Sequence, residues 1–149
     1  MLPRLPTVTK ALLIANAILF LLQQPFLLGD ATFAPFMLQP LQGSFDAFSP
    51  GGNFQPWQLL TYGFLHSGFM HLFFNMLGLW MFGSELERIW GQRRYMEFLG
   101  ASVLTAAATQ LLISAAFGWG NPTVGASGGL FGLLLAFGSW RVRPCPSWA

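Results

Sequence analysis

Charged side chains are scarce in this sequence. Asp, Glu, Lys and Arg make up 8% of its 149 residues, while 54% are hydrophobic. Soluble domains carry about 25% charged residues, so the composition argues against a water-soluble globule. The net charge of +2 is too small and too scattered to indicate a nucleic-acid partner.

Cysteine and histidine are nearly absent as well. The single Cys145 excludes an internal disulfide, and no cluster of Cys and His has the spacing of a zinc site. The two histidines, His66 and His71, are five residues apart, which suits shared metal coordination on a regular helix poorly. We therefore expect neither a metal nor a cofactor.

Long apolar runs are what the sequence does have. Four of them approach the ~20 residues that a membrane-spanning helix needs, and they cover residues 11–28, 62–82, 98–117 and 123–140. Polar residues interrupt the first run, whose core, 11–22, also has the length of a signal-peptide apolar region. Because longer runs follow, we favour a retained first span over a cleaved signal. The prediction is an all-α multi-pass membrane protein.

The segment 29–56 between the first two runs is apolar but broken by Pro and Gly, and it contains no Lys or Arg. Its backbone polar groups would be unsatisfied in lipid, so it cannot span the bilayer. We expect it to lie at the membrane interface, with a short amphipathic helix near 34–41.

The basic residues predict the orientation. With the N-terminus in the cytoplasm, the cytoplasmic pieces are residues 1–10, 83–97 and 141–149. These pieces hold all seven Lys and Arg residues, and the two external loops hold none. This pattern follows the positive-inside rule. It predicts an integral protein of a bilayer such as the bacterial cytoplasmic (inner) membrane.

One hydroxyl stands among small residues in the fourth run, in the stretch GASGG at 125–129. At 1.5 Å per helical residue, Ser127 and His66 lie roughly 6 Å from the outer side and His71 roughly 14 Å. Polar residues in spans usually face the bundle interior, so these side chains are expected to converge. A serine among glycines is also common where membrane helices simply pack closely.

His71 and Asn75 are four residues apart and share one helical face. By themselves they could form no more than a polar seam between helices. On the fourth run, a stripe of small residues and a second close-approach pair could likewise form a packing seam: Gly125, Gly129, Gly132 and Ala136, and the pair Gly128 and Gly132. Periodicity alone leaves both interpretations open.

Three stretches together resemble the rhomboid intramembrane serine proteases: WQLLT at 57–61, HSGFMHLFFNM at 66–76 and GASG at 125–128. The similarity extends from the first span to about Gly138. The first external loop is similar to the lipid-embedded L1 loop of that family, although Trp57–Gln58 stands where a Trp–Arg pair is usual. The resemblance implies a rhomboid-like helical bundle of membrane spans within residues 1–138.

The resemblance also implies roles. Ser127 would be the nucleophile, and His71 and Asn75 would support the oxyanion together with backbone N–H groups near Ser127. His66 would shape the active-site cavity, and Gly125 and Gly128 would allow close approach of helices. The substrates would be transmembrane or membrane-proximal segments of membrane proteins.

The family pattern is incomplete in one respect. Rhomboids use a Ser–His dyad whose histidine lies on a sixth span, and this sequence has four of the usual six spans and no third histidine. Residues 139–149 diverge from the family, and our hypothesis is a frameshift or premature stop near Ser139. The chain alone is then expected to be inactive. Two alternatives remain: a non-proteolytic binder of client transmembrane helices, and a structural subunit.

Overall fold

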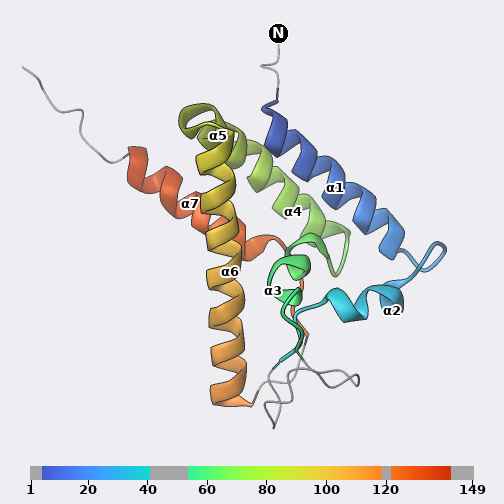
Figure 1. The fold of residues 1–149 in the computed structure, drawn as a ribbon. Helices are drawn as coiled ribbons and strands as arrows, with labels where there is room; N and C mark the ends of the chain where they lie inside the picture. Colours follow the sequence, from blue (N-terminus) through green and yellow to red (C-terminus); the bar gives the residue numbers. More distant parts are fainter. Residues whose placement is uncertain (1–4, 41–53, 119–121, 142–149) are drawn as a thin grey trace, which may run out of the picture.

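The computed structural model describes residues 5–40, 54–118 and 122–141, and most of these are helical. The described residues contain one isolated pair of extended residues, Leu38 and Thr123, and the all-α prediction is confirmed. The helices, shown in Figure 1, are α1 (Thr7–Gln23), α2 (Asp30–Phe33), α3 (Gln58–Thr61), α4 (Phe69–Gly78), α5 (Ser84–Trp90), α6 (Gln92–Phe117) and α7 (Ser127–Arg141).

The helix that carries His71 begins later than its apolar run. Residues Tyr62–Phe64 form a 3₁₀ turn, and residues 65–68 form a non-helical loop with a bend at 67–68, so α4 starts only at Phe69. From there a π-helical turn at Leu79–Gly83 joins α4 to α5 without a break in the helical backbone. The run 62–82 therefore corresponds to a loop followed by one long helical rod, which continues to Trp90.

The other helices also depart from the apolar runs at their ends. α1 ends at Gln23 because Pro25 follows it, and α6 begins at Gln92, six residues before its run. α7 begins at Ser127 because Thr123 is paired with Leu38 instead of continuing a helix. The apolar runs therefore predict where these helices lie in the sequence but not the residues at which they begin and end.

Segment 29–56 contains short helical turns in its described part. α2 is followed by a 3₁₀ turn at Ala34–Phe36, where a short helix was expected, and residues 41–53 of that segment lie outside the described residues. Phe36 exposes 44% of its surface, and Phe26, three residues before the segment, exposes 77%, which suits an interface location. Of the tail 139–149, the structure describes only the end of α7.

The helices pack as a bundle in which α1 lies beside α4 and α7 crosses α6 (Figure 1). Small residues bring α7 and α6 together, since Gly128 lies against Ala106, Gly129 against Val103 and Gly132 against Ser102. Glycine and other small residues at such crossings let two backbones approach closely. The α6–α7 pair forms the most extensive helix contact in the described part of the chain.

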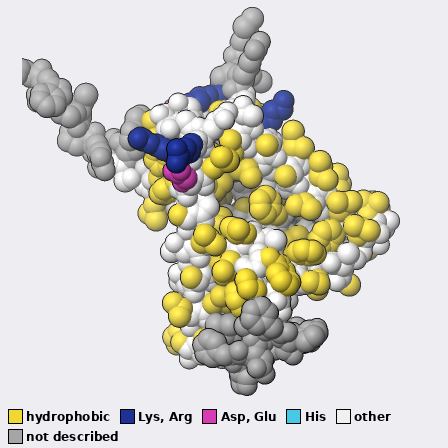
Figure 2. Space-filling model, in the orientation of Figure 1, with side chains coloured by type: hydrophobic (Ala, Val, Ile, Leu, Met, Phe, Trp, Pro, Cys, Tyr) yellow, Lys and Arg dark blue, Asp and Glu magenta, His cyan; other side chains and the backbone are white. Residues whose placement is uncertain are grey.

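Among the described residues, one helix is long and apolar enough to cross a bilayer. This helix is α6, with a mean hydropathy of 1.6 and only 17% of its apolar window buried inside the protein. Thr7–Gln23 and Ser127–Ser139 are shorter apolar helices. Figure 2 shows hydrophobic side chains over much of the visible face, and Lys and Arg gathered at the end where α1 begins.

The side chain of Glu87, which belongs to a different helix, caps the N-terminus of α1. Pro6 precedes α1 and offers no side-chain cap. The buried carboxylate of Glu87, on α5, accepts hydrogen bonds from the backbone N–H groups of Val8 (2.9 Å) and Thr9 (2.7 Å) and from the Thr9 hydroxyl (2.8 Å). The first N–H groups of a helix lack partners within the helix, and its dipole favours a negative charge at that end. Glu87 therefore anchors α1 to the α4–α5 rod.

Replacing Glu87 by Gln should lower the free energy of unfolding by about 2 kcal/mol, because charge-assisted hydrogen bonds at a buried site are lost. The measurement is unfolding in detergent micelles by SDS titration, followed by circular dichroism. Glu85→Gln is the matched control, since Glu85 is 45% exposed and lies 3.9 Å from Arg88. An exposed pair contributes at most about 1 kcal/mol. Equal effects of the two substitutions would contradict the anchoring role of Glu87.

Candidate active site

Ser127 is the first residue of α7, and the segment before it is tied to the rest of the fold. Thr123 and Leu38 exchange backbone hydrogen bonds of 2.9 and 3.0 Å, and the Gly125 N–H donates to the Tyr62 carbonyl at 2.9 Å. Ser127 is half-buried. The N–H groups in the first turn of a helix have no partners within the helix, and the helix dipole favours negative charge there. The site around Ser127 is therefore suited to an anion.

Gly125 lets a side chain from α4 lie directly on the backbone next to Ser127. Its φ is +122°, a conformation that favours glycine. A Cβ atom at this position would lie 2.6 Å from both Cε1 and Nε2 of His71, and 3.7 Å from Nδ2 of Asn75. Both side chains therefore face the Gly125–Ser127 segment from the neighbouring helix.

His71 is oriented by a residue that the sequence analysis did not single out. Its Nδ1 atom lies 3.1 Å from the Ser67 hydroxyl oxygen. When Ser67 donates this hydrogen bond, the ring carries its hydrogen on Nε2, the atom that lies against Gly125. In this tautomer His71 presents a donor to the Ser127 segment.

His66 is almost fully buried, with 2% of its surface exposed, and lies behind His71. The two rings meet edge to face, with centroids 5.2 Å apart. Gln23, at the end of α1, holds the backbone of His66: its Oε1 accepts from the His66 N–H at 3.1 Å, and its Nε2 donates to the His66 carbonyl at 3.4 Å. Sequence reasoning missed Gln23. The feature that could have identified it is its position as a polar residue inside an apolar run, where such residues cost free energy.

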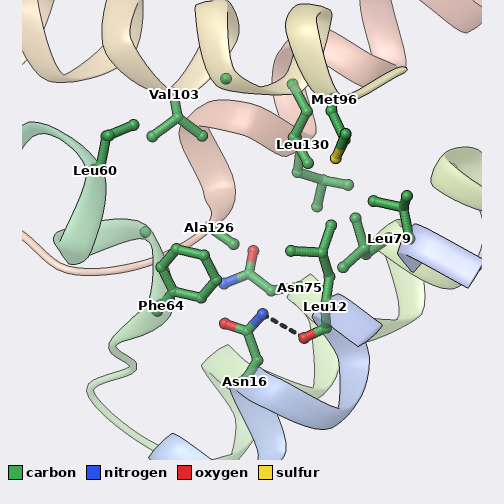
Figure 3. A pocket seen from close by; sticks show the side chains of 14 residues that line it. Leu12, Asn16, Leu60, Phe64, Asn75, Leu79, Met96, Val103, Ala126 and Leu130 are labelled. Carbon is green, nitrogen blue, oxygen red and sulfur yellow. Dashed lines mark hydrogen bonds between the residues drawn. The ribbon is translucent and has the colours of Figure 1, made fainter. Parts of the chain in front are cut away.

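Asn75 lies one helical turn after His71 and is 4% exposed. Its Nδ2 atom has no hydrogen-bond partner among the described residues, and Figure 3 shows its amide turned toward Ala126 and Phe64. Buried amide N–H groups are normally paired. Asn75 therefore has donor capacity to offer to a ligand or to water.

The structure brings His71, Asn75 and Gly125 together beside Ser127, with His66 in contact with His71. Gly128, the residue after Ser127, faces a different side of α7, where it lies against Ala106 on α6 and the Tyr62 hydroxyl at a close approach of the two helices. Within the described ranges, no three His, Cys, Asp or Glu side chains lie close enough to hold a metal ion. The arrangement offers one hydroxyl, two side-chain donors and a helix N-terminus, a set suited to stabilising a developing oxyanion.

Replacing Gly125 by Ala should destabilise the protein by more than about 1 kcal/mol, because alanine is strained at positive φ and its Cβ would overlap the His71 ring. The measurement is the same SDS titration, together with the ¹⁵N chemical shifts of the His71 ring. Gly138→Ala on α7 is the control, since a Cβ at Gly138 meets no atom within 4 Å. Unchanged His71 shifts in Gly125→Ala would contradict the contact.

The sequence is similar to a known family of proteins. Residues 53–143 match the Rhomboid domain, which is well over half of the chain. The Rhomboid protease GluP of Bacillus subtilis is 38% identical over 78 residues, which is 52% of this chain and 14% of that protein. RHOMBOID-like protein 1 of Arabidopsis thaliana is 32% identical over 117 residues, covering 72% and 29% of the two chains.

A third relative, the Rhomboid protease GlpG of Klebsiella pneumoniae, is 28% identical over 102 residues, covering 68% of this chain and 34% of that protein. The chain thus spans about a third or less of the length of these relatives. The matched domain contains both histidines, Asn75 and Ser127. The chain belongs to the rhomboid family of intramembrane serine proteases.

Proposed function

We propose that Ser127 is the nucleophile of an intramembrane endopeptidase that cleaves transmembrane or membrane-proximal segments of membrane proteins. The observation that carries the proposal is the placement of His71 and Asn75 against the Gly125–Ser127 segment at the start of α7. Two side-chain donors that lie against the segment leading to a half-buried hydroxyl at a helix N-terminus are the groups that a serine nucleophile requires.

The chemistry follows from these groups. The Ser127 hydroxyl attacks the scissile carbonyl carbon and gives its proton to a base, because a neutral hydroxyl is a weak nucleophile. The carbonyl oxygen becomes an oxyanion, which accepts hydrogen bonds from Asn75 Nδ2–H, His71 Nε2–H and backbone N–H groups of the first turn of α7. One such donor contributes about 3–4 kcal/mol to transition-state stabilisation. Collapse expels the amine, which takes the proton, and water then hydrolyses the acyl-enzyme.

The proton acceptor of this reaction lies outside the 149 residues in our proposal. The sequence has two histidines, and both have other contacts: His66 is buried behind His71, while His71 bonds Ser67 and lies on Gly125. Each is suited to support the oxyanion side of the site. A further helix, from the same or another polypeptide, would have to deliver the base to Ser127.

An open groove beside Ser127 supports the docking of such a helix. It has a volume of about 520 Å³, runs between α6 and α7, and starts at Gly128, the residue after Ser127. Small and hydroxyl-bearing residues line it, among them Ala101, Ser102, Thr105, Ala106 and Gly132. Residues of this kind mark helix contacts inside membranes.

The same groove favours a second candidate function, a non-proteolytic membrane protein that binds the transmembrane helices of clients. In that case the occupant of the groove is the client, and Ser127 performs no chemistry. The two functions differ in what happens to Ser127 when the groove is filled.

Labelling of Ser127 by a fluorophosphonate probe separates the two functions. The chain alone in detergent should not be labelled, because no base activates the hydroxyl. Co-expression with the C-terminal membrane helices of the Bacillus subtilis relative should restore labelling, while Ser127→Ala should abolish it and Ser139→Ala should not. Ser139 lies on α7 and bonds the Ala136 carbonyl at 2.9 Å.

Labelling of the isolated chain would contradict the external base. A helix fragment that co-purifies with the chain but leaves Ser127 unlabelled would contradict the protease proposal and favour the client binder.

Filling the groove should weaken docking under either function. Ala101→Leu places a bulky side chain in the groove and should reduce co-purification of the helix fragment about tenfold, a loss of about 1.4 kcal/mol. Ala108→Leu is the matched control, because Ala108 is also exposed on α6 but does not line the groove. Equal co-purification with both variants, measured by quantitative pull-down in nanodiscs, would show that the groove is not the docking surface.

A further inference from the structure

A cavity of about 220 Å³ lies among α1, α4, α6 and α7, beside the loop that leads into α4. Figure 3 shows this cavity from close by. Its lining is almost entirely apolar, with side chains such as Leu12, Phe64, Leu79, Val103 and Leu130. Two carboxamides, those of Asn16 on α1 and Asn75 on α4, are the exceptions.

Each carboxamide leaves a polar atom without a partner. Asn16 is 3% exposed; its Nδ2 donates to the Leu12 carbonyl at 2.7 Å, and its Oδ1 has no partner among the described residues. Asn75 is 4% exposed, and its Nδ2 is likewise unpaired. In Figure 3 the two amides lie on the same side of the cavity, near Phe64. One free acceptor and one free donor therefore face the same space.

The free-energy cost of the two unpaired polar atoms favours a bound molecule in this cavity. A buried polar atom without a partner costs about 1–3 kcal/mol, and this cavity would hold two such atoms. Water enters cavities that offer polar partners, whereas wholly apolar cavities of similar size stay dry. A water molecule donates to one neighbour and accepts from another, which matches the free Oδ1 of Asn16 and the free N–H of Asn75.

We propose that the cavity is a hydration site and that Asn16 is a positioning residue for Asn75. Water bound between Asn16 Oδ1 and Asn75 Nδ2 takes one of the two N–H groups of Asn75 and fixes the plane of its amide. The second N–H then points to the Gly125–Ser127 segment, where the oxyanion forms. The positioning half of this inference rests on the proposed function, and the hydration half does not.

This role explains why α1 carries a buried Asn in the middle of an apolar helix. The Asn16 side chain already bonds its own helix through Nδ2, which holds the side chain in one rotamer with Oδ1 free. Gln24 makes a similar bond to the Phe20 carbonyl at 2.9 Å but does not line the cavity. The two residues therefore form a matched pair for testing.

The experiment uses the full chain in nanodiscs with ¹⁵N-labelled asparagine, and measures magnetisation transfer between water and the side-chain amide of Asn75. The Asn75 signals are assigned by their loss in Asn75→Ala. We expect a contact with long-lived water in the unaltered chain, its loss in Asn16→Leu, its retention in Gln24→Leu, and its recovery in Asn16→Ser, which restores an oxygen acceptor. The Asn75 amide shift should move only where the water contact is lost.

Absence of the water contact in the unaltered chain would overturn the hydration site. Its persistence in Asn16→Leu, with an unchanged Asn75 amide shift, would overturn the role of Asn16. Both measurements are repeated in Ser127→Ala, because hydration needs no nucleophile. A chain that shows the Asn16-dependent water contact but is not labelled at Ser127 even with the co-purified C-terminal helices of the Bacillus subtilis relative would refute the protease proposal and leave the hydration site intact.

Discussion

The hydrogen bond from the Gly125 N–H to the Tyr62 carbonyl joins the two halves of the site. At 2.9 Å it ties the segment before α7 to the turn before α4, and the Tyr62 hydroxyl donates to the Val103 carbonyl of α6 at 3.0 Å. In an apolar environment no water is available to replace these hydrogen bonds if they break. The start of α7 is thus fixed against α4 and α6 together, and the positions of Ser127, His71 and Asn75 depend on that junction.

The fold class and the apolar segments could be predicted from the sequence, because the cost of placing charge in lipid acts on every residue of a run. The first turns of the helices could not. α4 starts at Phe69 and α7 at Ser127 because Leu38 pairs with Thr123 and Tyr62 with Gly125. These contacts join residues far apart in the chain, and no local pattern of hydropathy encodes them.

The candidate site was predictable for a different reason. His71 and Asn75 were indicated by their spacing of four residues, which places them on one helical face, and Ser127 by its position among small residues. The resemblance to rhomboids then connected the three. Gln23 and Asn16 were missed because a single polar residue in an apolar run looks like an interruption, and Glu87 was missed because it stands among other charged residues in the piece 83–97. Each of the three has a distant partner or a cavity that only the folded chain supplies: the α1 N-terminus, the His66 backbone and the space beside Asn75.

The two attachments of α1 have a consequence for how this helix can vary. Glu87 holds its first turn and Gln23 holds the loop before α4, so the two ends of α1 are bound to the helical rod and to the loop that leads directly into it. Each inserted residue would lengthen α1 by 1.5 Å and rotate one end by about 100° relative to the other. Both attachments could not survive that change. The number of residues between Thr9 and Gln23 is therefore constrained, while the apolar side chains that face lipid between them can be exchanged for others of similar hydropathy.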